Sequence, residues 1–280
     1  MPPGVERVQL LSNNGVNLQQ NEQALSLKIN NLLTGDSRGV FKTLNLDIRQ
    51  YGKLSMYLHA ESVTGQRPLK DNELYAVVRV GQDFLNNYYE IKIPLKITPP
   101  GTYPRGQEEK VWPIENNLDF SLRDLIDLKL RRNNLGRSLS NIYREVSGNK
   151  TISILGNPNL GEVRGILVAI ENPLKLDGAI VNTEVWVNEL RLSQLDERGG
   201  WAASGRVDLT LADLGTISVS ANTHTQGFGT LEQWVNERAR ENLMQFDAAA
   251  TIDAGNLVPK AARLSFPIYA SINRTLLTPV

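Results

Sequence analysis

Hydrophobic and polar residues alternate along most of the chain, in short runs separated by turn-forming residues. Alternation with a period of two predicts β-strands that bury one face. The run Leu74–Val80 is instead almost continuously apolar, which is typical of a strand covered on both faces. The predicted strands are centred on residues 25–29, 44–48, 54–58, 74–80, 89–97, 152–154, 165–170 and 184–192.

One stretch has helical rather than strand periodicity. Ser121, with Asp124 three residues later, is a weaker form of the capping box that begins helices, and residues 133–136 contain the signals that end one. Many short strands, one helix and regular turn signals predict a mainly β fold, a β-sandwich of jelly-roll type. The apolar stripe of the predicted helix is Leu118, Leu122, Leu125 and Leu128.

The pattern changes at residues 195–201, where Leu-Asp-Glu-Arg-Gly-Gly-Trp separates two kinds of strand. Beyond this stretch, runs of about the 9–11 residues that cross a bilayer keep bulky apolar side chains on one face only. The expected connections are short, long and short, as in outer-membrane barrels. The sequence predicts a sandwich domain, residues 1–195, and antiparallel hairpins of a transmembrane β-barrel, residues 196–280. The pattern alone also allows a soluble meander with one face on a core.

The expected facing of these strands gives two sets of candidate site residues. Four strands cannot close a barrel, because the smallest barrels need about eight, so further strands must come from elsewhere. Candidates for a water-filled lumen are Arg206, Asp208, Asn222, His224, Asp247, Asp253, Arg263 and Asn273. Candidates for contact with lipid are Val207, Leu209, Ile217, Val219, Ile252, Leu264, Phe266 and Ile268.

The predicted hinge consists of Asp196, Arg198, Gly199, Gly200 and Trp201. Adjacent acidic residues at 196 and 197 would point to opposite faces of a strand, so a turn and an ion pair with Arg198 are expected instead of acid–base catalysis. The two glycines would let the backbone swing from the sandwich into the first barrel strand. Trp201 is either an aromatic residue at the membrane boundary or a core residue.

Composition and charge narrow the function classes. The chain has 280 residues, 41% of them hydrophobic, which suffices for one large or two ordinary domains. Its 30 basic and 30 acidic residues leave no positive excess to attract nucleic acid. The absence of cysteine excludes disulfides and thiolate metal sites. His59 and His224 have no nearby carboxylate at metal-ligand spacing, so we expect surface or lumen histidines and no cofactor.

Several stretches, in order along the chain, resemble the SprA/Sov family. The longest is EVWVNELRL at 184–192, which continues into DERGGWAA at 196–203. That family forms the outer-membrane translocon of the Bacteroidetes type IX secretion system, which is tied to gliding motility, and this chain resembles an internal part of a longer member. The other similar stretches are NLQQNEQ at 17–23, DIRQY at 47–51, NYYEI at 87–91, VWP at 111–113, GNPN at 156–159 and GFGT at 227–230.

The resemblance implies a non-enzymatic segment of a large protein-conducting channel in the bacterial outer membrane. The implied partners are outer-membrane lipid, the remaining barrel strands of a longer chain, other secretion-system components and secreted cargo, but not nucleic acid. The long connection 227–245 would be extracellular, which places the sandwich outside the cell. The first alternative is a soluble, non-catalytic surface module that binds carbohydrate or protein. A jelly-roll hydrolase is more remote, because no convergent carboxylate pair is evident.

Overall fold

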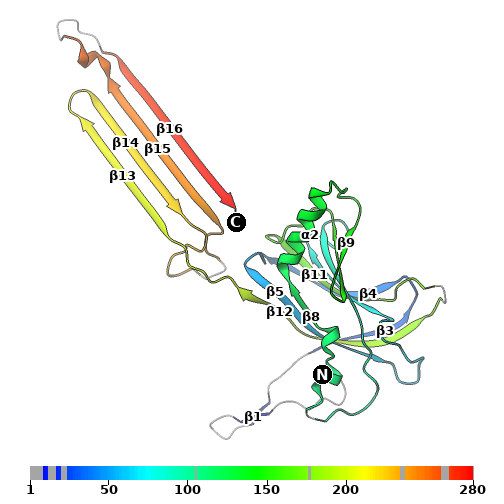
Figure 1. The fold of residues 1–280 in the computed structure, drawn as a ribbon. Coiled ribbons are helices and arrows are strands. Elements are labelled where there is room, and N and C mark those ends of the chain that lie inside the picture. The colour runs from blue at the N-terminus through cyan, green and yellow to red at the C-terminus, as the bar shows by residue number, and fades with distance from the viewer. Residues whose placement is uncertain are drawn as a thin grey trace. The chain divides into compact units, whose positions relative to one another are not determined.

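The computed structural model describes residues 9–11, 17–19, 24–104, 106–175, 178–233, 237–259 and 265–279. The chain divides into two compact units, Met1–Leu195 and Asp196–Val280. Antiparallel strands dominate both units, so the predicted mainly β, sandwich-like fold is confirmed (Figure 1). A small antiparallel hairpin is formed by β1 (Gln9–Leu11) and β2 (Asn17–Gln19).

The first unit is a sandwich of two antiparallel sheets. Its first and last strands are neighbours in one sheet, and the chain passes repeatedly between the sheets, which is jelly-roll winding. The smaller sheet has the order β3 (Leu25–Leu32), β12 (Val181–Leu195), β5 (Tyr51–Ser62) and β8 (Leu118–Ser121). The larger sheet has the order β4 (Ser37–Leu46), β11 (Val163–Glu171), β6 (Tyr75–Gly81), β7 (Tyr88–Pro94), β10 (Lys150–Leu155) and β9 (Tyr143–Ser147).

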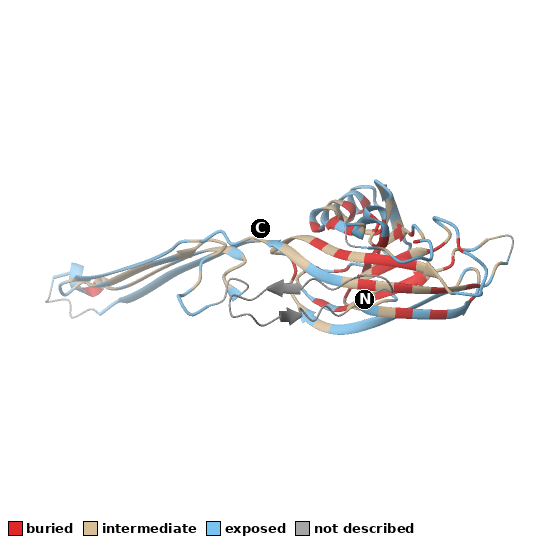
Figure 2. Ribbon diagram, turned by 90° about the horizontal axis from the view of Figure 1, so that it is seen from below, coloured by how far each residue is buried: buried red, intermediate tan, exposed pale blue. Residues whose placement is uncertain are grey.

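Inward-facing residues of both sheets fill one hydrophobic core (Figure 2). Most of the run 74–80 is buried, including adjacent residues that point to opposite faces of β6, such as Val77 and Val78, whereas Tyr75 and Arg79 are half-buried. Pro94 predicts either an edge strand or a proline nitrogen on an unpaired side, and β7 is an inner strand between β6 and β10. Pro94 is the last residue of β7, pairs only with Tyr75, and lies beyond the ladder to β10, which ends at Lys92. The proline therefore interrupts no hydrogen-bonded ladder.

The main helix, α2 (Leu122–Asn134), packs against β10 and β5. Ser121 precedes it at the N-cap position, but its side chain makes no capping hydrogen bond. Leu118 lies in β8 and not in the helix, so that part of the predicted stripe was wrong. In β8, buried Leu118 and Phe120 alternate with exposed Asp119 and Ser121, a strand too short for its period to be recognised. Two shorter helices, α1 (Glu108–Val111) and η1 (Ile114–Asn116), precede β8.

The second unit is a meander of four antiparallel strands in chain order, β13 (Ala202–Leu211), β14 (Gly215–His224), β15 (Glu241–Asp253) and β16 (Pro267–Pro279). The last connection is longer than predicted, because it covers residues 254–266 and contains η3 (Ala254–Leu257). Asp253 holds it by accepting hydrogen bonds from the N–H groups of Gly255 and Phe266, at 3.0 and 2.9 Å. No helix in the described ranges is long and apolar enough to span a membrane.

Candidate functional site: an amphipathic sheet and the hinge before it

The register of the second unit fixes which side chains share a face. Arg206 lies opposite Ser220, Ser220 opposite Asp247, and Asp247 opposite Asn273. Directly opposed residues in an antiparallel sheet point to the same face, and so do residues two apart along a strand. One face therefore carries all the lumen candidates that the structure describes: Arg206, Asp208, Asn222, His224, Asp247, Asp253 and Asn273. Arg263 lies outside the described residues.

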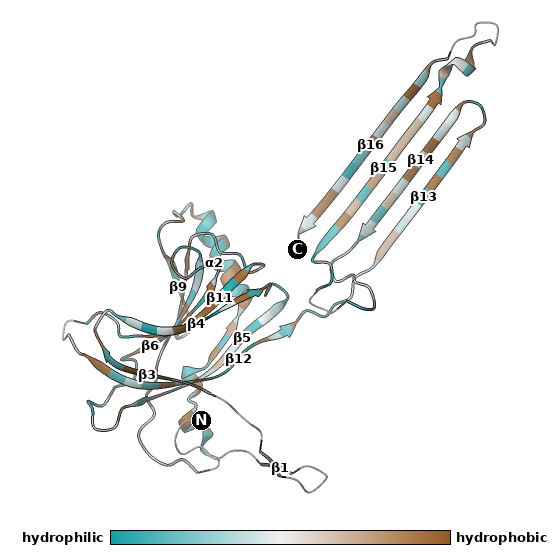
Figure 3. Ribbon diagram, turned by 180° about the vertical axis from the view of Figure 1, so that it is seen from behind, coloured by the Kyte–Doolittle hydropathy of each residue, from teal (hydrophilic) through white to brown (hydrophobic). Residues whose placement is uncertain are grey.

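The opposite face carries bulky and small apolar side chains. Figure 3 shows hydrophobic and hydrophilic residues interspersed along these strands. Val207 lies opposite Val219, Val219 opposite Ala248, and Ala248 opposite Ile272. Arg274, which the sequence analysis did not consider, is exposed on this face opposite Phe246. The lipid candidates on this face are Val207, Leu209, Ile217, Val219, Ile252 and Ile268. Phe266 lies just before β16, and Leu264 lies outside the described residues.

The apolar face of this sheet has no core to cover it within the second unit. In the described part of residues 196–280, no hydrophobic side chain is buried, and Val207 and Ile272 are 55% and 60% exposed. The first unit, in contrast, buries hydrophobic side chains from Leu27 to Val187. A contiguous uncovered apolar face of this kind marks contact with a partner or with lipid.

The polar face satisfies its own charges. Arg206 Nε lies 2.8 Å from Asp208 Oδ2, and these residues are two apart on one strand. Asp247 accepts hydrogen bonds from Gln245 Nε2 at 3.1 Å and from Asn273 Nδ2. Exposed pairs of this kind add little stability. They instead give the face a hydrated surface of mixed charge.

The hinge contains the ion pair that the sequence suggested. Arg198 Nη2 lies 2.7 Å from Asp196 Oδ2, and hydrogen bonds from the Arg198 guanidinium and main-chain N–H lower the pKa of Asp196. The Trp201 N–H donates to Thr225 Oγ1 at 2.9 Å, and the Trp201 side chain is exposed instead of packed in a core. The hinge is thus bonded to the segment that follows β14.

Glycine is required at position 200, because the main chain of residues 225–228 lies too close to leave room for a side chain. A Cβ atom at Gly200 would lie 2.4 Å from Phe228 N, whereas nothing lies within 4 Å of one at Gly199. Gly227 has φ +82°, and its Cβ would lie 2.2 Å from Arg198 O. The main chains of the DERGGW and GFGT motifs therefore pack closely against each other at the start of β13. Both motifs resemble the family, but their spacing in the sequence does not predict that they meet.

His59 is not the surface residue that the sequence analysis expected. Its side chain is 2% exposed, and Nδ1 lies 2.7 Å from Val111 O and 3.2 Å from Thr98 Oγ1. His59 lies on the outer face of β5, where the β7–β8 connection covers it. His224 stacks on Phe228 with ring centroids 6.3 Å apart. No group of three His, Cys, Asp or Glu residues suitable for a metal ion occurs in the described part of the chain.

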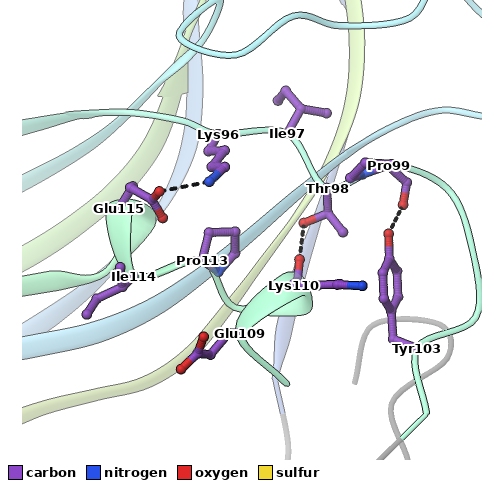
Figure 4. Close-up of a pocket in the computed structure, with 10 residues that line it drawn as sticks. All are labelled: Lys96, Ile97, Thr98, Pro99, Tyr103, Glu109, Lys110, Pro113, Ile114 and Glu115. Carbon is purple, nitrogen blue, oxygen red and sulfur yellow. Dashed lines mark hydrogen bonds and ion pairs between the residues drawn. The ribbon is translucent and has the colours of Figure 1, made fainter. Parts of the chain in front are cut away.

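A pocket of about 610 Å³ lies beside the same connection (Figure 4). Its polar groups mostly bind one another: Lys96 Nζ lies 2.7 Å from Glu115 Oε1, and Tyr103 Oη donates to Pro99 O. The pocket is a candidate site for the alternative function, the binding of carbohydrate or protein. Its lining does not indicate a particular ligand. Its lining residues are Lys96, Ile97, Thr98, Pro99, Tyr103, Glu109, Lys110, Pro113, Ile114 and Glu115.

Together these features define a class of protein, a jelly-roll sandwich that continues into a sheet with one uncovered apolar face. The whole chain, residues 1–280, matches the SprA_N family, described as motility related/secretion protein. The chain therefore belongs to this family, which confirms the resemblance and makes it a secretion- and motility-related protein. No curated protein matches the chain significantly.

Proposed function

We propose that residues 196–280 are transmembrane strands of an outer-membrane protein-conducting channel for type IX secretion and gliding motility, and that residues 1–195 are its non-catalytic sandwich domain. The uncovered apolar face of the β13–β16 sheet, opposite a hydrated one, carries this proposal. The strands have 10 to 13 residues, at least the 9–11 that a tilted strand needs to cross a bilayer. Membership of a secretion-related family supports the same function.

If lipid covers the apolar face, the strands must meet a further structural requirement. Hydrocarbon offers no hydrogen bonds, so strands that span a membrane must form a closed barrel. Within the described residues β13 and β16 are the two edges of this sheet, and the smallest barrels have about eight strands. The proposal therefore includes further strands, from a longer chain, beside these edges. Secreted cargo would pass the polar face, whose mixed charge does not retain proteins of either sign.

The chain has no cysteine, so a cysteine introduced at one position carries the only spin label. Such labels can be placed one at a time along β14 (Gly215–His224) to test the proposal. Labels at Ile217, Val219 and Ala221 should respond to a lipid-soluble relaxation agent in isolated outer membranes. Labels at Ser218 and Ser220 should respond to a water-soluble agent, which gives a period of two. Labels along β4, which is exposed and belongs to the sandwich, should respond only to the water-soluble agent. Equal access of the water-soluble agent to both faces of β14 would contradict the proposal.

The alternative is a soluble surface module that binds carbohydrate or protein, and the pocket beside the β7–β8 connection favours it. In that case another protein would cover the apolar face of β13–β16. The alternative predicts a chain that is soluble in aqueous buffer once the protein that covers this face is present, whereas the channel predicts a need for detergent.

A further inference from the structure

Strand β12 (Val181–Leu195) is only half covered along one edge. Strand β3 pairs with its residues from Val181 to Val187, whereas β5 pairs with the opposite edge as far as Leu195. Figure 3 shows β12 running beyond the start of β3. Within the described residues, the stretch 188–195 of β12 therefore has a neighbouring strand on one side only.

A β-bulge marks the point where β3 stops. The register with β5 shifts between Asn188 and Arg191, and Glu189 has φ +50°, a left-handed conformation that is uncommon for such a residue. The extra residue reverses the facing of the strand. Odd-numbered residues such as Val187 face the core before the bulge, and Leu192 packs against it afterwards. The unpaired half of β12 thus keeps an apolar inner face.

An apolar slot of about 260 Å³ opens between the two sheets and is lined by this half of β12. For comparison, an apolar cavity of about 150 Å³ takes up benzene. The slot therefore has room for an aliphatic side chain. Its lining includes Leu44 and Leu46 of β4, Leu54 of β5, Val163 of β11, and Leu190 and Leu192 of β12.

We propose that residues 188–195 of β12 and this slot bind an extended peptide segment of a partner protein, which adds a strand in line with β3. The ladder between β12 and β3 indicates the occupant, because only an extended strand continues that pairing. Alternate side chains of such a strand point to the same face, so one of them enters the slot. Strand addition to an open sheet edge is a common mode of peptide recognition. The site lies in the sandwich and does not depend on the channel proposal.

The experiment measures binding of a fluorescent peptide with the sequence of β3, LSLKINNL, to the whole 280-residue chain in detergent. This probe has the required alternation and already pairs with β12 in the proposed direction. We expect saturable binding that Leu190→Glu weakens at least tenfold, because a carboxylate would stand at the slot. Leu130→Glu is the matched control on α2, since Leu190 and Leu130 are 38% and 53% exposed. A scrambled peptide with its leucines grouped together should bind at least tenfold more weakly.

Hydrogen exchange provides a second measurement that needs no variant. Bound peptide should slow amide exchange in residues 188–195 more than in residues 181–187, which β3 already covers. Absence of saturable binding, equal binding of the scrambled peptide, or unchanged exchange at 188–195 would overturn the proposal. A photo-cross-link from position 190 to the first 23 residues of the same chain would also overturn it, because the edge would then be occupied internally.

Discussion

At the scale of single residues, Arg132 links the end of α2 to the turn that follows β10. Its side chain is fully buried at the end of α2, and its guanidinium donates to Gly156 O and to Asn133 Oδ1. The Asn157 N–H in the same turn donates to Asn87 Oδ1 at 3.0 Å. Two stretches that resemble the family, NYYEI and GNPN, are therefore docked against one another.

Replacing Arg132 with Met should lower the free energy of unfolding by about 2 kcal/mol, because the Gly156 carbonyl would lose a charged donor in a buried place. Urea unfolding followed by circular dichroism measures the change. Arg123→Met, at an exposed position of the same helix, should alter stability by at most about 0.5 kcal/mol. Equal losses in the two variants would show that the buried hydrogen bonds are unimportant.

Asp83 should make the sandwich sensitive to acid. Burial raises the pKa of its carboxyl, but hydrogen bonds from the N–H groups of Asn86, Asn87 and Leu85 outweigh burial and lower the pKa to about 2. Since this lies below the ordinary 3.8, the stabilisation is present above about pH 4 and is lost as the pH falls towards 2. Urea unfolding should show Asp83→Asn less stable than wild type at pH 5, with a smaller difference at pH 2.5. A constant difference would contradict this assignment.

At the scale of elements, alternation predicted the existence of the four strands of the second unit and which of their residues share a face, since period-two patterns report facing directly. The assignment of these faces to lipid and to a lumen stays a prediction. Alternation missed β8 and β9, which have only four and five residues, and it expected the last strand to begin at Arg263 and not at Pro267. Pro267 is the first residue of β16, a position where a missing N–H costs no ladder bond. The Gly200 contact, the buried His59 and the half-covered edge of β12 depend on tertiary pairing, which no local pattern contains.

Val219 and Ser220 offer a matched test of the two faces, because they are adjacent on the inner strand β14 and point to opposite sides. Val219→Arg should destabilise the membrane-embedded protein by about 2–4 kcal/mol, the cost of an arginine facing lipid at mid-membrane. Ser220→Arg should cost little on a hydrated face. Urea unfolding from outer-membrane lipid vesicles measures both. Normal assembly of the Val219→Arg protein would show that the facing assignment is wrong.

At the scale of the whole molecule, the distribution of buried residues indicates that the two units are stabilised in different ways. Buried hydrophobic side chains of the described residues all lie between Leu27 and Val187, within the first unit. The second unit has continuous hydrogen-bonded ladders but no comparable core. We infer that the sandwich is stabilised by burial in water, whereas the β13–β16 sheet depends on what covers its apolar face.

Residues 1–195 produced alone should therefore be monomeric and unfold cooperatively in aqueous buffer. Residues 196–280 produced alone should aggregate unless detergent is present, because their apolar face stays uncovered. Size-exclusion chromatography and thermal unfolding measure both outcomes. A second fragment that is monomeric without detergent would remove the main support for the membrane assignment.

The topology of the second unit also predicts which side of the membrane the sandwich occupies. Strand β13 begins at the end of the sheet where residues 225–240 connect β14 to β15, and long connections of outer-membrane barrels are extracellular. The opposite connection, 254–266, is shorter by only a few residues, so the difference in loop length needs a direct test. Protease added to intact cells should cleave the sandwich, and an epitope placed in the exposed turn at Gly65 should be lost. A periplasmic marker protein controls for leakage, and an epitope cleaved only after the outer membrane is permeabilised would place the sandwich inside.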